Sequence, residues 1–475
     1  MNMEETLALY AQGKEAWNTW ANELLARRED SEAWKDAARV EFAPLGFQEV
    51  DFSGFIFPGN ALFLNTTFLT DVRFLKAVFM GSALFREVTF KGAAWFEEAT
   101  FERPALFREA TFERSSVFNE VIFKDVAGFQ GVTFEDTSRF GKVRFKNTAL
   151  FEGATFERGA IFSGAAFRDV VEFRGATFEE AAVFGEVRFK NKALFEEATF
   201  KGATLFPRAT FEEAAVFGLS TFEHSTSFYG VTFCAKADFK AVQGNSVFAM
   251  TDAEFLEVPD FQQATFVQAP RLDNVNIESR HSRNISFTAI KSFFRGDLEK
   301  EGRWRALKRL ATQGHDHASE QLFFRGELLA RRGVTDRYWH ASFWLGVFYQ
   351  LFSDFGRALI RPLLWWAVGV LVFAGIYLSH YPGNGEWFLL ECIAGTGKPW
   401  VAALGLSLHR SLPALSGFRD TLPQFHACLY GVHSESPFRP IIPDVVSFLS
   451  VPQVLFSAVM IFLFLLAVRN HFRIK

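Results

Sequence analysis

The chain has 475 residues, and its 54 acidic and 50 basic side chains give a formal net charge of −4. This balance excludes a dedicated nucleic-acid-binding protein, whose surface would be strongly basic. Three scattered cysteines, Cys234, Cys392 and Cys428, form no CxxC pair and predict no disulfide framework. The acidic first residues lack the basic and apolar pattern of a signal peptide, so we expect this part of the chain in the cytosol.

The first 45 residues are predicted to form a helical cap. Apolar and aromatic residues, among them Leu7, Trp17, Trp20 and Leu24, recur at helical spacing within residues 3–41. We interpret residues 1–45 as a cap whose tryptophans dock on the structure that follows. A helix that binds a partner is the alternative.

Residues 46–270 are predicted to form a solenoid. From Phe52 to Phe239, phenylalanine recurs with a spacing that alternates between five and six, so the series contains seventeen units of eleven. A fixed short repeat places every unit in the same environment, stacked on its neighbour. Ala, Val, Ser or Thr stands two residues before each phenylalanine of the series. The exception is Phe55, which occupies this position before the next phenylalanine of the series. In an extended segment these two side chains point the same way, and we expect both to face inward.

The phenylalanines of this series are interpreted as a structural interior stack. The narrow core of a solenoid requires one large and one small apolar side chain per segment. An aromatic binding strip is the alternative. The predicted stack contains Phe101, Phe107, Phe112, Phe118, Phe123, Phe129, Phe134, Phe140, Phe145, Phe151, Phe156, Phe162, Phe167, Phe173 and Phe178.

The repeated segments, such as residues 110–114 (ATFER) and 176–180 (ATFEE), resemble the pentapeptide-repeat family. The resemblance implies a right-handed quadrilateral β-helix, with the large apolar residue at the centre of each face. Residues 13–20 look like the helical leader that often precedes such repeats. Every second unit carries an extra residue, so if two units of eleven make one coil, a coil has about 22 residues; a different number of residues per coil is the alternative. The series then contains about 8.5 coils and rises roughly 40 Å.

After Phe239 the spacing becomes irregular, which predicts a fraying final coil or a short looped cap. Residues 271–350 hold fourteen basic and nine acidic side chains, with apolar residues at helical spacing. Gly314 and Asp316 indicate the turn between two helices. We interpret residues 271–350 as a basic helical hairpin that joins the solenoid to the rest of the chain.

Residues 351–475 are predicted to form a membrane domain. Two uncharged apolar runs, residues 363–378 and 445–468, predict membrane-spanning helices near residues 360–379 and 445–468. Basic residues lie at the start of the first span and the end of the second, so both chain ends are expected in the cytoplasm. These flanking residues are Arg357, Arg361, Arg469, Arg473 and Lys475.

The C-terminal part resembles membrane-bound bacterial pentapeptide-repeat proteins. The matching stretches are residues 353–357 (SDFGR), 361–363 (RPL) and 462–470 (FLFLLAVRN). The resemblance implies a multi-pass protein of the bacterial inner (plasma) membrane. It implies no particular reaction.

The chain contains no nucleophile elbow, P-loop, dinucleotide fingerprint or HExxH motif, so we predict no enzyme, catalytic residue, cofactor or metal site. We favour a membrane-anchored scaffold that presents its rod to a cytosolic protein. A channel or pore subunit is the first alternative, because residues 399–408 form an apolar stretch between the spans. A DNA-mimicking topoisomerase inhibitor is the second, but residues 51–270 hold 29 acidic against 22 basic side chains, a weak excess. Expected partners are the lipid bilayer and a protein, with self-association left open and no nucleic acid.

Overall fold

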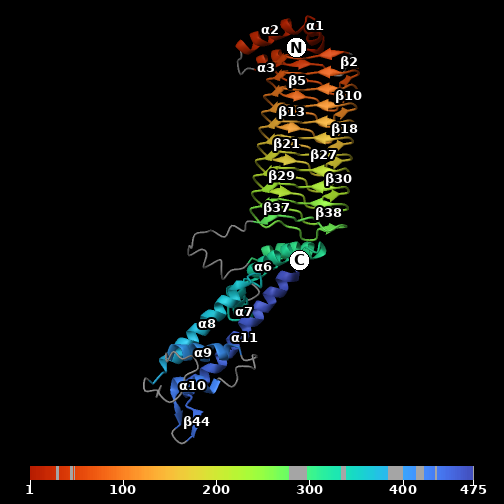
Figure 1. Ribbon diagram of the computed structural model, residues 1–475. Helices are drawn as coiled ribbons and strands as arrows, with labels where there is room; N and C mark the ends of the chain where they lie inside the picture. Colours follow the sequence, from red (N-terminus) through yellow and green to blue (C-terminus); the bar gives the residue numbers. More distant parts are fainter. Residues whose placement is uncertain are drawn as a thin grey trace. The chain divides into compact units, whose positions relative to one another are not determined.

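The chain forms two compact units, the first running to Ala330 and the second from Arg331 onward. The first unit is a stack of coils with helices at both ends, and the second is mainly helical (Figure 1). The computed structural model describes residues 1–27, 32–42, 46–47, 49–277, 297–332, 338–382, 399–412, 422–433 and 436–473.

The coils contribute two-residue strands to four parallel sheets, which we name sheets A to D in the order in which the chain visits them. Sheet A contains β1 (Val40–Glu41), β5 (Ala61–Leu62), β9 (Ala83–Leu84), β13 (Ala105–Leu106), β17 (Ala127–Gly128), β21 (Ala149–Leu150), β25 (Val171–Glu172), β29 (Ala193–Leu194), β33 (Ala215–Val216) and β37 (Ala237–Asp238). Sheet B contains β2 (Gly46–Phe47), β6 (Thr67–Phe68), β10 (Thr89–Phe90), β14 (Thr111–Phe112), β18 (Thr133–Phe134), β22 (Thr155–Phe156), β26 (Thr177–Phe178), β30 (Thr199–Phe200), β34 (Thr221–Phe222), β38 (Gln243–Gly244) and β41 (Thr265–Phe266).

Sheets C and D are the other two sheets of the solenoid. Sheet C contains β3 (Val50–Asp51), β7 (Val72–Arg73), β11 (Ala94–Trp95), β15 (Ser116–Val117), β19 (Ser138–Arg139), β23 (Ala160–Ile161), β27 (Ala182–Val183), β31 (Thr204–Leu205), β35 (Thr226–Ser227) and β39 (Phe248–Ala249). Sheet D contains β4 (Ile56–Phe57), β8 (Val78–Phe79), β12 (Thr100–Phe101), β16 (Ile122–Phe123), β20 (Arg144–Phe145), β24 (Ala166–Phe167), β28 (Arg188–Phe189), β32 (Thr210–Phe211), β36 (Thr232–Phe233), β40 (Glu254–Phe255) and β42 (Asn276–Ile277).

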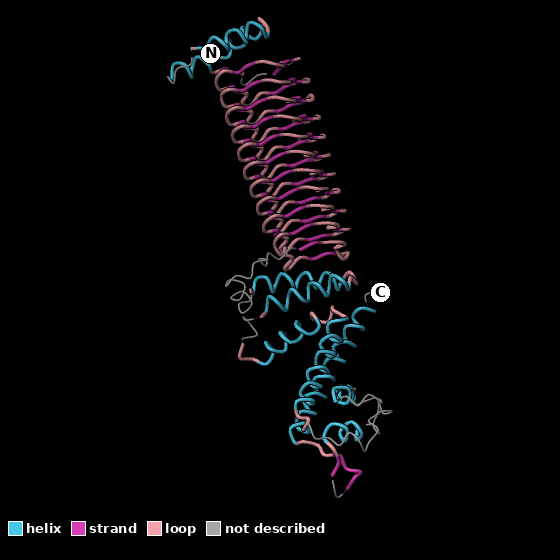
Figure 2. Tube along the Cα trace, turned by 60° about the vertical axis from the view of Figure 1, so that its left-hand side comes forward, coloured by secondary structure: helices cyan, strands magenta, loops and turns pink. Residues whose placement is uncertain are grey.

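From β1 to β40, neighbouring strands of a sheet are four places apart in the chain, so four strands make one coil; in the last coil β38 pairs with β41 and β40 with β42. Thr89 pairs with Thr111 in sheet B, and Ser116 pairs with Ser138 in sheet C. Side chains that meet between neighbouring coils are 22 positions apart, as in the hydrogen bond between Lys124 and Glu102. The predicted β-solenoid and its coil length are therefore confirmed. Figure 2 shows the same stacking, with the short strands of successive coils lying one above another.

The alternation of five and six residues corresponds to two kinds of corner. After sheets A and C the next phenylalanine follows five residues later, and the second corner residue has a positive φ, as in Glu98 (58°) and Leu219 (61°). Between residues 50 and 277 such residues recur every eleven positions, from Gly54 to Asn274. In this range the six-residue corners after sheets B and D contain none. The extra residue thus lets the chain turn without the left-handed backbone that side chains disfavour.

The interior of the solenoid holds the phenylalanine rings and the small side chains two residues before them. Through most of the series a ring stacks on the ring of the next coil, as Phe118 does on Phe140, with centroids 4.9 Å apart and planes at 1°. Rings of sheets A and C also meet edge to face, as Phe129 and Phe140 do at 5.7 Å and 89°. Strand spacing fixes the stacking distance, and the edge contacts fill the space across the coil.

The solenoid continues beyond the regular phenylalanine series. Phe261 stacks on Phe239 with a centroid distance of 4.8 Å. Gly244 stands where earlier coils of sheet B have phenylalanine, and Phe248 stands in the small-residue position of sheet C. The Phe248 ring contacts the rings of Phe222 and Phe266, which belong to sheet B in the coils on either side of Gly244. The expectation of a fraying final coil directly after Phe239 is wrong, because large and small positions are exchanged there.

Three helices, α1 (Met3–Tyr10), α2 (Lys14–Ala26) and α3 (Glu32–Ala38), precede the coils. Trp17 of α2 is fully buried, and its indole Nε1 donates a hydrogen bond to the carbonyl of Ile56 at 2.8 Å. Asn18 donates to the Gly54 carbonyl and accepts from the Ile56 amide, both at 2.9 Å. Helix α2 thereby covers the first coil and satisfies backbone groups that no earlier coil can reach.

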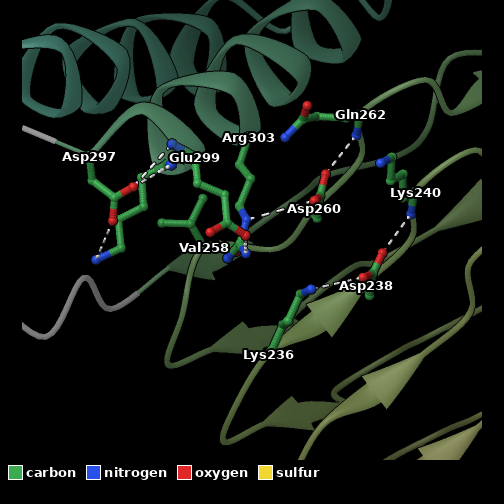
Figure 3. Close-up of polar contacts among 10 residues, drawn as sticks. Lys236, Asp238, Lys240, Val258, Asp260, Gln262, Asp297, Glu299 and Arg303 are labelled. Atoms are coloured by element: carbon green, nitrogen blue, oxygen red, sulfur yellow. Dashed lines mark hydrogen bonds and ion pairs between the residues drawn. The ribbon is translucent and has the colours of Figure 1, made fainter. Parts of the chain in front are cut away.

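A hairpin of α5 (Leu298–Gln313) and α6 (His317–Arg331) covers the last coils. Arg303 of α5 is buried, donates to the Val258 carbonyl at 3.2 Å and lies 3.8 Å from the Asp260 carboxylate (Figure 3). Arg309 donates to the Ala264 carbonyl at 2.9 Å. The hairpin thus supplies hydrogen-bond donors to carbonyl groups in the last of the described coils.

The second unit contains α7 (Ala341–Ser353), α8 (Ile360–Ser379), α9 (Pro399–Ser411), α10 (Leu422–Tyr430) and α11 (Asp444–Arg473). A small antiparallel pair is formed by β43 (Val432–His433) and β44 (Ser436–Pro440). Helices α8 and α11 are long and apolar enough to cross a membrane. They pack directly on each other, and a Cβ at Gly369 of α8 would lie 2.3 Å from the Phe456 ring of α11.

Candidate interaction surfaces and a buried polar cluster

The fifteen phenylalanines of the predicted stack, Phe101 to Phe178, all point into the solenoid, and each is at most 1% exposed. None of them is available to a ligand at the surface. The groups that a partner would meet are the side chains on either side of each phenylalanine, which face outward.

The outward positions form regular ladders with a different chemistry on each face. Sheet B carries threonines in register over eight coils, and sheet A carries leucines at the corresponding position. The threonines are Thr67, Thr89, Thr111, Thr133, Thr155, Thr177, Thr199 and Thr221. The leucines that are not buried are Leu84, Leu106, Leu150 and Leu194. Such flat, regular faces are typical of surfaces that bind another protein.

A shallow groove follows the corner between sheets C and D, lined by Glu97, Asn119, Gly141 and neighbouring residues. Asn119 donates to the Glu97 carboxylate at 3.3 Å and accepts from the Gly141 amide at 3.0 Å. At its rim, Lys142 pairs with Glu120 at 3.4 Å. These polar groups bond to one another, so the groove shows ladder contacts and no catalytic arrangement.

Other basic residues of the hairpin are paired within it. Arg305 contacts Glu301 and Glu327, and Lys308 also contacts Glu327. Burial raises the pKa of the Glu327 carboxyl, but hydrogen bonds from Lys308 and Arg305 outweigh this and hold that pKa below its usual range. The positive charges that the sequence places before the membrane domain are thus used in part to hold α5 against α6.

The helical unit contains a polar cluster between α8, α9 and α11. Gln453 of α11 is fully buried and donates through Nε2 to the Ser407 carbonyl at 2.8 Å and to the Ser411 hydroxyl at 3.0 Å. The hydroxyl of Tyr377 on α8 donates to the amide oxygen of Gln453. The Ser407 hydroxyl donates to the Val370 carbonyl at 2.7 Å. One amide therefore joins three helices.

A cation borders this cluster. Arg410 of α9 donates to the Val446 carbonyl at 2.8 Å and to the Nε2 atom of His426 on α10 at 3.0 Å, which fixes the neutral tautomer of the histidine. Burial, together with the positive charge of Arg410, lowers the pKa of His426 to about 4. Among the described residues, no carboxylate lies within 4.0 Å of Arg410. Sequence spacing gave no signal for this cluster, because its members come from four separate helices.

The predicted basic flanks lie at one end of the helical unit. Arg357 and Arg361 are exposed at the start of α8, and Arg469 is exposed near the end of α11. Asn470 donates to the Gly356 carbonyl at 3.5 Å, which ties these two helix ends together. Arg473 is the last residue of α11. The predicted flanking residue Lys475 lies outside the described residues.

The two cysteines of the described residues differ. Cys234 in the solenoid is a thiol, whereas Cys428 of α10 is disulfide-bonded. The sequence spacing did not predict this bond. In the described part of the chain, no three His, Cys, Asp or Glu side chains gather into a group that would hold a metal ion.

The comparison with protein families identifies the coils. A family model described as pentapeptide repeats, in nine copies, matches residues 52–100, 85–132, 96–143, 118–166, 129–177, 140–188, 162–206 and 184–232. These overlapping matches cover the regular part of the solenoid. No curated protein and no solved structure matches the chain.

Proposed function

Residues 52–232 belong to the pentapeptide-repeat family, and on this basis we propose that the protein is a membrane-anchored scaffold without catalytic activity. Its solenoid presents flat faces to a protein partner, and its helical unit holds it in a lipid bilayer. The observation that carries the proposal is the exposed apolar surface of the two long helices. Only 28% of the most apolar stretch of either helix is buried in the protein.

The exposed side chains of α8 and α11 have the chemistry of a lipid-facing surface. Leu364 and Leu371 of α8 are 59% and 62% exposed, and Leu455 and Phe462 of α11 are 62% and 63% exposed. Helix α7 adds Leu345 to this apolar surface at 67%. In water such a surface would promote aggregation, whereas in a bilayer it costs nothing.

The orientation follows from the ends of the helical unit. Arg361 and Arg469 lie at the end expected in the cytoplasm by the positive-inside rule. Cys428 lies toward the other end, because the hydroxyl of Tyr430 donates to the carbonyl of Tyr377 at the end of α8. A disulfide persists in an oxidising compartment, so Cys428 supports an extracytoplasmic position for this end. We therefore place the solenoid in the cytoplasm at the inner membrane.

Anchoring is tested by alkaline carbonate extraction of membranes that contain the full chain. We expect the protein to stay in the pellet and to be released only by detergent. The double variant Leu455→Arg and Phe462→Arg should shift it toward the soluble fraction, while Leu219→Arg on the solenoid serves as the control. Full-length protein that is soluble without detergent would contradict the anchor.

The solenoid cysteine tests the orientation. In intact cells, a membrane-impermeant maleimide should leave Cys234 unlabelled, and Cys234 should react only after the membrane is opened. Labelling of Cys234 in intact cells would contradict a cytoplasmic solenoid.

The partner is sought with a photo-crosslinking amino acid at outward positions of the full chain, such as Leu106 on sheet A and Ile161 on sheet C. A scaffold should give an adduct with another protein from one of these faces. If neither position gives a crosslink to another protein, the result would count against the scaffold.

A channel subunit is the second candidate, favoured by the position of α9 and its polar residues against α8 and α11. Purified full-length protein in liposomes distinguishes the two proposals. Ion flux above that of empty liposomes would support the channel, and its absence would support the anchor.

A further inference from the structure

Charge on the solenoid is separated between two faces. On sheet D, the outward positions of four successive coils, β16 to β28, carry six exposed basic side chains and no acidic one. On sheet B, the residue that follows each phenylalanine from β14 to β26 is a glutamate. We name these the basic strip and the acidic strip. The basic strip contains Lys124, Arg144, Lys146, Arg168, Arg188 and Lys190, and the acidic strip contains Glu113, Glu135, Glu157 and Glu179.

The two strips lie on opposite faces at the same height. The chain visits sheets A, B, C and D in turn around each coil, so sheets B and D face away from each other across the phenylalanine interior. Glu113 and Lys124 belong to the same coil, eleven residues apart, and the same holds for Glu179 and Lys190. The solenoid is therefore polarised across its width, although residues 51–270 carry an excess of only seven negative charges.

Most of these charges have no counter-ion among the residues that the structure describes. Lys124 pairs with Glu102 at 2.6 Å, and Glu179 pairs with Lys201 at 2.8 Å. Across the described residues, the other five cations and three carboxylates of the strips form no ion pair within 4.0 Å. Asp125 and Asp169 stand at the corner beside the basic strip. Each accepts hydrogen bonds from an asparagine and a backbone amide.

Both strips place like charges in register. Lys124 and Lys146 stand on neighbouring strands of sheet D, which lie about 4.8 Å apart, and Glu135 and Glu157 do so on sheet B. Like charges directly opposite each other on neighbouring strands destabilise a sheet. A partner that brings the opposite charge at the same spacing would remove this repulsion.

We propose that the basic strip of one copy binds the acidic strip of a second copy, with the two solenoids side by side and their coils in register. The second copy fits because both strips repeat with the same strand spacing and extend over the same four coils. The overall negative charge of the repeats opposes a nucleic acid as the occupant. The inference stands on the solenoid alone and goes beyond the proposed scaffold function.

The contact is heterologous, since it joins different faces of identical chains. Each bound copy keeps one strip free, so the association forms open rows and does not stop at a dimer. Because the strips are exposed, salt should weaken the association strongly.

Two charge-reversed variants of the full chain test the proposal in detergent solution. Lys146→Glu, Arg168→Glu and Lys190→Glu leave three cations and three carboxylates on the basic strip and so cancel its net charge, whereas Glu135→Lys, Glu157→Lys and Glu179→Lys make both faces basic. The matched control reverses three arginines of sheet A, with Arg86→Glu, Arg108→Glu and Arg174→Glu. Circular dichroism verifies that each variant is folded, and sedimentation velocity measures association at 50 and 500 mM salt.

We expect the wild type and the control to associate at 50 mM salt and to dissociate at 500 mM. Each strip variant alone should associate at least tenfold more weakly, and an equimolar mixture of the two should associate again. Equal association of all variants, a monodisperse wild type at low salt, or failure of the mixture would overturn the proposal. Binding of heparin or duplex DNA that needs the basic strip, without self-association, would also overturn it.

Discussion

The solenoid and the helical unit differ in the side chains that fill their interiors. In the solenoid, one ring type repeats, and Phe140 meets the same neighbours as any other ring in its column. Among its buried hydroxyls, those of Ser116 and Ser138 find no hydrogen-bond partner in the described residues, whereas that of Ser220 donates to the Phe217 carbonyl at 2.6 Å. In the helical unit, Gln453 of α11 makes hydrogen bonds to two other helices, α8 and α9, in an arrangement that does not repeat.

The two interiors differ in how far a change in one residue reaches. A coil depends on its two neighbours, so damage should spread little beyond the adjacent coils. The polar cluster joins segments far apart in the chain, so a change in one member affects several helices together. The substitutions below separate these two behaviours, beginning with the most destabilising.

Replacing Phe140 by alanine should lower the free energy of unfolding of the surrounding coils by about 3–5 kcal/mol, the usual cost of emptying a buried aromatic site. The ring is fully buried and stacks on Phe118 and Phe162 at 4.9 and 4.8 Å. Hydrogen exchange should show lost protection in these coils, with little change near Trp17. Phe140→Leu serves as the milder control. Equal loss along the whole solenoid would contradict the nearest-neighbour picture.

Acid should destabilise the helical unit through His426. The unfolded chain takes up a proton as the pH falls below about 6.5, but the folded state resists it until the pH nears the lowered pKa of about 4. Stability should therefore fall between pH 6.5 and 4, by about 3 kcal/mol at roughly 1.4 kcal/mol per pKa unit. Thermal unfolding in detergent micelles across this range measures it.

His426→Gln should flatten this pH dependence, because the amide cannot take up a proton. Exposed His471, changed to glutamine, is the control and should leave the dependence intact. An unchanged slope in His426→Gln would assign the acid sensitivity to other groups.

Replacing Arg303 by leucine should loosen the hairpin from the end of the solenoid by about 2–3 kcal/mol, because a buried carboxylate loses its cation. Asp260 keeps its hydrogen bond from the Gln262 amide at 2.9 Å, which limits the loss. Hydrogen exchange of the α5 amides should become faster, while the central coils stay protected. The double variant Arg303→Leu and Asp260→Leu should recover part of the loss.

The smallest expected change in stability concerns the five-residue corners. Leu219 has φ 61°, and Leu219→Gly should stabilise its coil by about 0.5–1 kcal/mol by removing the left-handed strain of a side chain. Gly153 has φ 63° and open space where a Cβ would stand, so Gly153→Leu should cost a similar amount. Denaturant midpoints measure both, and the same sign for the two changes would refute the corner rule.

The repeating part was predictable because its rules are local. Phenylalanine spacing indicated the coil length, and the apolar runs indicated α8 and α11 to within a few residues at most boundaries. The charged strips were also present in the sequence as Lys124, Lys146, Arg168 and Lys190, each 22 positions apart. They become visible only once the coil length assigns them to one face.

The solenoid could be derived from the order of residues alone, because a period of eleven gives every segment the same neighbours whatever lies elsewhere in the chain. Only the folded structure reveals that Arg303 meets Asp260, that Arg410 bonds to His426, and that Gly244 is balanced by Phe248. These contacts join residues whose spacing follows no period. Their geometry depends on how whole helices and coils pack, which no local pattern records.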